Sequence, residues 1–208
     1  LEEDTPPPEL NGIRALLVDE KNMGKQLKFV TVVLNADTGE LLHMDRGKKG
    51  ESFSSFLRLL NPDQKASIQA VGMDRAGSYK KAVEEHLPDA EIVFDRFHLV
   101  MNINEAVNET RRNEQNRASE EDKKHLKGTR FILLRNGANL NEDQQGKLDE
   151  LIKLNDSIST AYILKEQFQT VYTYKSKGWA KRYLSQWCEM ARESALPPFV
   201  RLAKGFER

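Results

Sequence analysis

Three aspartates each follow an apolar run that is typical of a buried β-strand. Asp19 ends the run IRALLVD, Asp74 ends IQAVGMD and Asp95 ends AEIVFD. In α/β folds, ligands and metals collect at the carboxyl ends of strands, because these ends open onto a crevice. The spacing therefore predicts a carboxylate site that the fold assembles. The alternative is that each aspartate only caps the loop or helix that follows it.

Paired carboxylates from separate strands suit metal-assisted phosphate chemistry. Mg²⁺ prefers hard oxygen ligands and keeps several waters for substrate phosphates. In two-metal sites the cations lie about 3.5–4 Å apart and stabilise the attacking and the leaving oxygens. We expect Asp19 and Asp74 to bind Mg²⁺ or Mn²⁺ in such a site. Glu20 is left out, because successive side chains of a strand point to opposite faces.

The elements that must position these acids follow the order strand, strand, strand, helix, strand, helix, strand. Strands are predicted over 13–19, 27–35, 40–44, 67–73 and 90–94, and helices over 52–60 and 78–87. This order matches an α/β fold with a ribonuclease-H-like core, a mixed five-stranded sheet of three antiparallel and then two parallel strands. In that core the first and fourth strands are adjacent, so Asp19 and Asp74 would face each other.

From about Val100 the pattern becomes helical, and no further strand is predicted. Helices are expected over 99–117, after Ser119, after Asn141, over 157–174 and 178–192, and after Pro197-Pro198. The aromatic stripe of Trp179, Tyr183 and Trp187 is interpreted as helix-packing core. We therefore divide the chain into a linker (1–12), a catalytic core (13–104) and a helical region (105–208).

Composition narrows the class of protein. The chain of 208 residues has 32 Lys and Arg against 32 Asp and Glu, so a uniformly basic DNA-coating module is disfavoured. No apolar run approaches the length of about 20 residues that a membrane span needs. Cys188 is the single cysteine, which excludes internal disulfides. These features predict a soluble protein that fits a reducing cytoplasm.

Longer stretches carry a family resemblance. The segments VGMDRAGSYKKAVEEHLPDAEIVFDRFHLVMNINEAVNETRR, LKGTRFILLRN and LDELIKLNDSISTAYILKEQF occur in this order. With the tryptophan-containing helix that ends in ARES, they resemble the DDE transposases of bacterial insertion sequences, in particular the ISL-three family. The resemblance extends from Ile13 to Arg208. It implies a metal-dependent recombinase that nicks DNA at transposon ends and joins the freed 3′-hydroxyl to a target, acting as a homodimer.

The resemblance also implies roles for individual residues. Asp19 matches the first acid of the family and Asp74 the second, although Asp95 competes for the second role. With Asp74 as the ligand, Asp95 and His98 resemble an auxiliary Asp/Cys-x-x-His motif, in which His98 would orient DNA or a phosphate. The alternative for His98 is a packing or capping histidine.

One departure from the family pattern affects the expected activity. The third acid, a Glu that follows a helical insertion, has no match before Arg208, and the upstream zinc-binding and helix-turn-helix parts have no match either. We therefore expect a central fragment that holds two of three catalytic acids and is weak or inactive alone.

Two other functions compete with this interpretation. One is a non-catalytic DNA-binding or oligomerisation module, whose phosphate contacts would come from Arg111, Arg112, Lys181 and Arg182, with Lys123 and Lys124. The other is a phosphatase with a nucleophilic aspartate. A phosphatase expects a second acid two residues after the first, and Lys21 stands there instead.

Overall fold

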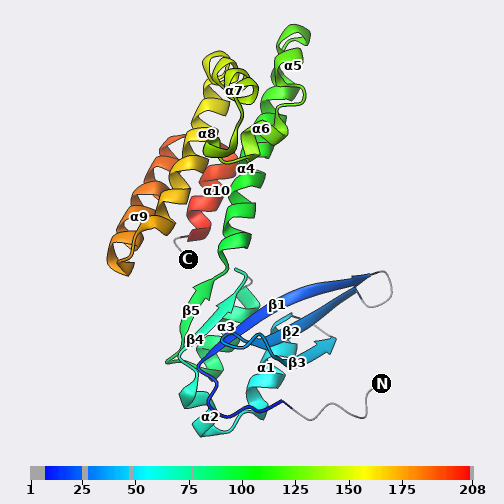
Figure 1. Ribbon diagram of the computed structural model, residues 1–208, viewed down its shortest axis with the longest axis vertical. Helices are drawn as coiled ribbons and strands as arrows, with labels where there is room; N and C mark the ends of the chain where they lie inside the picture. The colour runs from blue at the N-terminus through cyan, green and yellow to red at the C-terminus, as the bar shows by residue number, and fades with distance from the viewer. Residues whose placement is uncertain (1–7, 25–27, 47–48, 76, 207–208) are drawn as a thin grey trace. The chain divides into compact units, whose positions relative to one another are not determined.

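The computed structural model describes residues 8–24, 28–46, 49–75 and 77–206. The chain forms two compact units, Leu1–Leu99 and Val100–Arg208, which are coloured along the chain in Figure 1. Most of the predicted linker, 1–12, lies outside the described residues. The predicted limits of the core and helical regions stay predictions.

The first unit contains one mixed sheet of five strands. Its elements are β1 (Ala15–Gly24), β2 (Lys28–Asn35), β3 (Leu41–Arg46), α1 (Lys49–Leu59), α2 (Pro62–Ser67), β4 (Ala70–Met73), α3 (Gly77–His86) and β5 (Glu91–Phe94). The strand order is β3-β2-β1-β4-β5. β1 pairs antiparallel with β2, and β2 with β3, whereas β4 is parallel to both β1 and β5. This topology confirms the predicted ribonuclease-H-like α/β fold.

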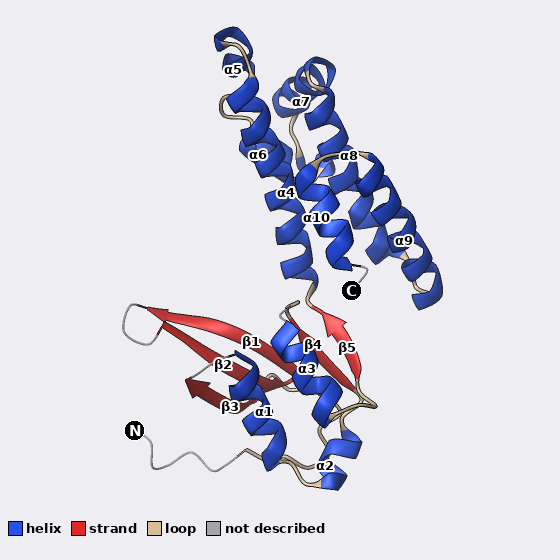
Figure 2. Cartoon of the chain, turned by 180° about the vertical axis from the view of Figure 1, so that it is seen from behind, coloured by secondary structure: helices blue, strands red, loops and turns tan. Residues whose placement is uncertain are grey.

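Buried and exposed side chains alternate along the strands, so one face of the sheet is covered. Leu16 and Val18 on β1 are buried, whereas Leu17 between them is 43% exposed. The buried strand residues share a core with Phe53 of α1 and Tyr79 of α3, whose rings meet edge to face. Figure 2 shows α1 and α3 on the same side of the sheet. Burial of these apolar side chains is the main stabilising contribution in this unit.

The short helix α2 was not predicted from the sequence. The predicted helix over 52–60 and the predicted strand over 67–73 have no helix between them. Asn61 is instead the N-cap of α2: its side chain accepts from the Gln64 amide, and the Gln64 side chain accepts from the Asn61 amide. Pro62 stands at the first turn, where its missing N–H costs nothing. A capping box therefore starts a new helix at this point.

The second unit is helical throughout its described residues, as predicted. Its elements are α4 (Arg96–Arg117, which begins in the first unit), α5 (Glu120–Leu126), α6 (Arg130–Leu134), the 3₁₀ helix η1 (Gly137–Asn139), α7 (Glu142–Leu154), α8 (Asp156–Gln169), the 3₁₀ helix η2 (Thr170–Thr173), α9 (Lys177–Glu193) and α10 (Pro197–Phe206). Ser119 and Asn141 are N-caps, as their positions before acidic first turns predicted. Among the described helices, none combines the length and apolar character that crossing a membrane requires.

The core of the second unit is aromatic. Trp187 of α9 is fully buried and packs against Phe168, Phe199 and Phe206. Its indole N–H donates to the Leu164 carbonyl over 2.8 Å, so the buried polar atom is satisfied. Trp179, in the same predicted stripe, is 58% exposed. The interpretation of the stripe was therefore only partly correct, since the residues in the first turn of α9 are exposed or half-buried.

A buried lysine joins α8 to the end of α6. Lys165 is 2% exposed, and its ammonium group donates to the carbonyl oxygens of Leu133 (2.9 Å) and Arg135 (2.6 Å). The Glu166 carboxylate lies 2.7 Å away, and the Tyr162 ring centroid 4.2 Å away. Burial lowers the pKa of Lys165, and Glu166 opposes this effect. Three oxygen partners satisfy the buried charge, so the lysine has a structural role.

Candidate active site

The three aspartates predicted from the sequence each come directly after a residue of β1, β4 or β5, and these three residues are in register with one another. Val18 of β1 is in register with Met73 of β4, and Met73 with Phe94 of β5. The residue that follows each of these is Asp19 within β1, Asp74 just after β4 or Asp95 just after β5. The Asp95 amide donates to the Met73 carbonyl over 2.8 Å, which fixes the end of this ladder. The fold thus brings the three acids to one edge of the parallel part of the sheet.

The register also decides the face on which Asp19 lies. Asp19 is paired with Val32, whereas Glu20 is paired with Thr31 of β2. Thr31 is buried, and its hydroxyl lies 3.4 Å from the Tyr79 hydroxyl of α3. Residues that oppose each other in an antiparallel pair share a face, so Glu20 lies on the side of α3 and Asp19 on the other. Omitting Glu20 from the candidate site agrees with this geometry.

Asp19 lies within a strand that is longer than the sequence predicted. The expected strand ended at Asp19, whereas β1 continues to Gly24 through its pairing with β2. One carboxylate oxygen of Asp19 accepts from the Glu20 amide (2.8 Å), and the other lies 3.2 Å from the Lys21 ammonium group. The Asp19 side chain is 39% exposed. Its carboxylate is therefore accessible, with a cation beside it.

Asp74 follows the last residue of β4 and is partly buried. Its neighbour Arg75 places its guanidinium carbon 5.8 Å from the centroid of the Phe94 ring at the end of β5. Asp74 thus lies in the turn that leads from β4 toward α3, beside the neighbouring strand end. It is the acid closest to Asp19 in the strand order, because β4 is adjacent to β1.

The side chains of Asp95 and His98 contact each other at the start of α4. One Asp95 oxygen accepts from the Phe97 amide (2.7 Å), and the other lies 2.8 Å from His98 Nδ1. A carboxylate can only accept in this contact, so Nδ1 carries the proton. Nε2 is then the ring nitrogen that can meet a ligand. The Asp95 carboxylate thus contacts Phe97 and His98 of its own helix, an arrangement that matches the Asp-x-x-His motif expected from the sequence.

A metal site built from this part of the chain alone would be incomplete. Within the described residues, no group of three or more His, Cys, Asp or Glu side chains could hold a metal ion. Asp19 and Asp74 offer two carboxylates, which suits Mg²⁺ in kind, because this ion is often bound by one or two carboxylates and several waters. The donor set fits a magnesium site that receives further ligands from elsewhere.

The first pair of candidate DNA-binding residues is engaged along α4. The Arg111 guanidinium donates to Asn108 and Gln115, and Arg112 donates to Glu105 over 2.6 Å. Burial lowers the pKa of Arg111, and the charges of Arg112 and Arg130 add to the effect. Arg111 is half-buried and held by side chains of its own helix, which reduces its reach toward a DNA phosphate.

The second pair is more exposed. Lys181 and Arg182 lie on the outer surface of α9, and the Arg182 guanidinium carbon lies 5.5 Å from the centroid of the exposed Trp179 ring. Lys123 of α5 is paired with Glu120 over 2.6 Å, so its charge is largely compensated. Of the basic pairs proposed from the sequence, Lys181 and Arg182 remain the most accessible.

Sequence reasoning missed the contact between Lys21 and Asp19. Lys21 was considered only because it replaces the second acid of a phosphatase. The signal was present in the spacing, since residues i and i+2 of a strand lie on the same face. Using it required knowing that β1 continues beyond Asp19.

Comparison with known proteins identifies the family. The family model of the ISL3-type DDE transposases, which is described as a transposase, matches residues 16–208. The chain is 31% identical over 205 residues to the transposase for insertion sequence element IS1001 of Bordetella parapertussis, a match that covers 96% of this chain and 50% of that protein.

A second relative gives the same result. The chain is 28% identical over 219 residues to the transposase for insertion sequence element IS1557 of Mycobacterium tuberculosis, covering 94% of this chain and 49% of that protein. The chain thus spans about half the length of the curated relatives it matches. Because the family model matches nearly all of it, the chain belongs to the ISL3 family of DDE transposases.

Proposed function

We propose that this chain supplies two carboxylates, Asp19 and Asp74, of a metal-dependent site for DNA strand cleavage and strand transfer. The supporting observation is their register: each follows a paired residue on adjacent parallel strands, Val18 and Met73. The family membership supports DNA transposition as the process. The substrates would be transposon ends and target DNA, as proposed from the sequence.

In this proposal each residue has a distinct task. Asp19 and Asp74 hold the cations, Mg²⁺ or Mn²⁺, through their carboxylate oxygens. Bound there, the metals would activate the attacking oxygen and stabilise the leaving oxygen of the phosphodiester. Asp95 holds His98 in the tautomer that presents Nε2, and His98 contacts a phosphate of the DNA. Lys181 and Arg182 of α9 contact the DNA backbone.

A third acid would complete the ligand set. The two-carboxylate set and the matched half of the relatives' length are consistent with a Glu contributed from outside the described residues. We therefore infer that this chain binds metal weakly and cleaves DNA poorly by itself. Robust plasmid nicking by the chain in Mn²⁺, lost in Asp19→Asn, would overturn this inference about the third acid.

Metal binding tests the assignment of Asp19 and Asp74 directly. Mn²⁺ affinity would be measured from the loss of the free-ion signal in electron paramagnetic resonance. Because even outer-shell partners of a metal contribute about 10–100-fold to affinity, losing a direct ligand should cost at least about tenfold. We expect this loss in Asp19→Asn and in Asp74→Asn. Unchanged Mn²⁺ affinity in both would contradict the proposed site.

Asp89→Asn is the matched control. Asp89 is exposed and lies just before β5, at the end of the strand remote from Asp95. The same chemical change there should leave Mn²⁺ affinity as it is in the wild type. Equal unfolding curves for the three variants would show that any lost affinity is not caused by unfolding.

Assembly and location complete the proposal. We infer that the parent transposase acts as a homodimer on the bacterial nucleoid, in the cytoplasm. The competing function, a DNA-binding or oligomerisation module without catalysis, predicts DNA binding that does not change in Asp19→Ala and Asp74→Ala and does not need metal. Metal titration of DNA binding therefore separates the two functions.

A further inference from the structure

A pocket in the helical unit carries a concentrated positive charge. It lies among α5, the turn that follows it, α6 and α7, and has a volume of about 330 Å³. Three lysines line it, Lys124, Lys127 and Lys147, against one acid, Glu150. The space far exceeds the roughly 10–15 Å³ that a single water needs by this kind of measure. A hydrated phosphate group can therefore enter it.

The three ammonium groups are not neutralised locally. None of them forms a salt bridge with a carboxylate in the described part of the chain. This contrasts with the neighbouring Lys123, which is paired with Glu120. Like charges gathered around one concavity repel each other and raise the local concentration of anions. The net charge of the whole chain is zero, so a local patch of this kind is needed to attract a polyanion.

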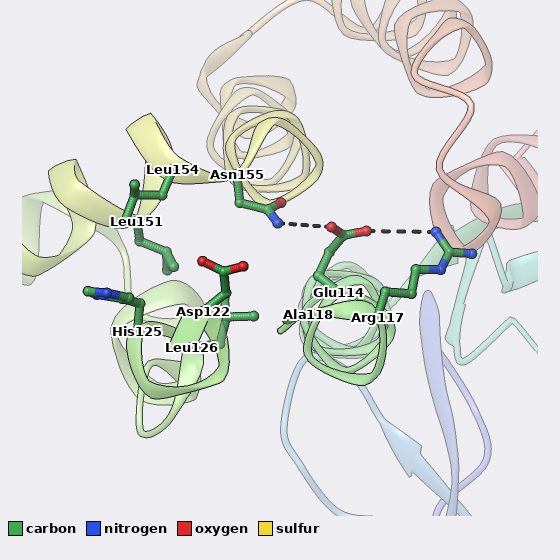
Figure 3. A pocket seen from close by; sticks show the side chains of 9 residues that line it. All are labelled: Glu114, Arg117, Ala118, Asp122, His125, Leu126, Leu151, Leu154 and Asn155. Atoms are coloured by element: carbon green, nitrogen blue, oxygen red, sulfur yellow. Dashed lines mark hydrogen bonds and ion pairs between the residues drawn. The ribbon is translucent and has the colours of Figure 1, made fainter. Parts of the chain in front are cut away.

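The adjoining pocket shows the opposite arrangement (Figure 3). It has a volume of about 190 Å³, and His125, Leu151 and Leu154 line both pockets. Three of its polar groups are paired with each other: Glu114 accepts from Asn155 over 2.9 Å and lies 3.9 Å from Arg117.

The second acid of this adjoining pocket is also satisfied. The Asp122 carboxylate accepts from the Ser119 hydroxyl over 2.7 Å at the start of α5. Both acids of this adjoining pocket are thus held by neighbouring side chains. The three lysines of the other pocket have no carboxylate partner among the described residues, so their charges suit an external anion.

The lysine-lined pocket also explains a motif without an assigned role, the LKGTR segment. Gly128 has φ of +78°, in the left-handed region that favours glycine, so the chain can turn sharply after α5. The Thr129 hydroxyl donates to the Leu126 carbonyl over 2.8 Å and fixes this turn. The turn places Lys127 at the pocket beside Lys124 of α5. Lys147 comes from α7, so two separate elements bring the charges together.

We propose that the pocket lined by Lys124, Lys127 and Lys147 binds a phosphate group of the DNA backbone. This proposal rests on the proposed function, from which DNA is taken as the polyanion. Lysine contacts to phosphates fix the position of a duplex without reading its sequence. The pocket would thus anchor DNA on the helical unit at a place distinct from the carboxylates.

Fluorescence anisotropy with a labelled duplex tests the proposal, with affinity measured over a range of salt concentrations. The test variant combines Lys124→Ala, Lys127→Ala and Lys147→Ala. Each phosphate contact contributes about 0.9 to the slope of log affinity against log salt. Because the pocket is proposed to hold one phosphate, we expect the slope to become shallower by about 1 and the affinity at moderate salt to fall by about tenfold. Replacing the same lysines by arginine should retain binding, because the charge is kept.

The matched control removes the same charge elsewhere. It combines Lys65→Ala, Lys81→Ala and Lys204→Ala, on α2, α3 and α10; α3 covers the sheet face opposite Asp19. This triple variant should retain the wild-type slope. Equal losses in both triple variants would show a general charge effect and would overturn the proposal, while leaving the metal site untouched.

A second arm separates DNA from free phosphate. Inorganic phosphate would be titrated at constant ionic strength into the wild type and the pocket variant. Phosphate binding that the pocket lysines provide, together with unchanged duplex affinity, would assign the pocket to a free anion and overturn the DNA assignment. A wild-type chain that binds Mn²⁺ at Asp19 and Asp74 but no duplex would overturn the pocket proposal, and would leave the carboxylate assignment to its own test.

Discussion

Lys21 Nζ lies 3.2 Å from Asp19 Oδ2 on the same face of β1. Both side chains are substantially exposed, so the pair contributes little to stability, about 0–1 kcal/mol. Its importance is electrostatic. A positive charge at this distance from a candidate metal ligand competes directly with a bound cation.

Removing this charge should strengthen metal binding. Two unit charges about 4 Å apart in water interact by about 1 kcal/mol, which corresponds to roughly fivefold in affinity. We expect Lys21→Gln to lower the Mn²⁺ dissociation constant by about three- to fivefold, and the gain to shrink as salt is added. Lys65→Gln serves as the control. An unchanged dissociation constant for Lys21→Gln would mean that the metal does not lie at Asp19.

Substitutions of Asp95 and of His98 should have two separable effects, one on stability and one on DNA binding. Asp95→Ala removes the acceptor of the Phe97 amide and should cost about 1 kcal/mol in the free energy of unfolding. Asp95→Asn keeps a capping oxygen and should cost much less. His98→Gln should leave stability within about 0.5 kcal/mol while weakening DNA binding. Urea unfolding and duplex anisotropy measure the two effects. A His98→Gln variant that is unstable yet binds DNA normally would support the packing role instead.

The two tryptophans of α9 should respond very differently to truncation. Trp187 is fully buried among aromatic rings, so Trp187→Ala should cost about 3–5 kcal/mol in unfolding free energy. Trp179 is mostly exposed, and Trp179→Ala should change stability by no more than about 0.5 kcal/mol. Because both changes occur in one helix, each variant controls for the other. Similar losses in both variants would show that Trp179 is packed in solution.

Alkaline stability should depend on Tyr162. Burial, followed by Glu166 and Asp149, raises the pKa of the Tyr162 hydroxyl to about 12. An unfolded tyrosine has a pKa near 10, so between about pH 10 and 12 the folded chain retains a proton that the unfolded chain has lost. The contribution of Tyr162 to the free energy of unfolding is therefore fully present below about pH 10. It is lost as the pH rises toward 12.

Comparison with Tyr162→Phe isolates this effect, because phenylalanine does not titrate. Urea unfolding at about pH 9, 10 and 11 should show a steeper loss of stability in the wild type than in the variant. Parallel pH dependences would indicate that the Tyr162 pKa is not raised. Loss of secondary structure before the titration would be detected by circular dichroism at each pH.

The sheet was predictable because its apolar runs are short and clearly bounded. The β-branched run around Val30 and the turn at Asp37 to Gly39 indicate a hairpin from local chemistry alone. The far end of β1 was not predictable. Glu20, Lys21 and Asn22 are polar and poor strand formers, and they are extended because β2 pairs with them. Tertiary pairing here overrides local preference.

The candidate site was predictable as a set of positions but not as a set of contacts. The three acids were predicted at the ends of their strands, and the register brings Asp19, within β1, level with the ends of β4 and β5. That both Asp95 oxygens are engaged by α4 depends on side-chain rotamers, which no sequence pattern specifies. Trp179 was assigned to the core because helical periodicity gives the face of a residue, not the length over which that face is covered.

The parallel pairing of β1 with β4 has a consequence for how the site tolerates change. Neighbouring strands lie about 4.7–4.9 Å apart along their hydrogen bonds. The separation of the chain at Asp19 and Asp74 is therefore set by peptide groups, which every residue carries, rather than by core side chains. Substitutions beneath the sheet that preserve this pairing should affect stability first and the spacing of the two carboxylates last. A site whose spacing is set by the backbone can keep its geometry while most of the surrounding sequence changes.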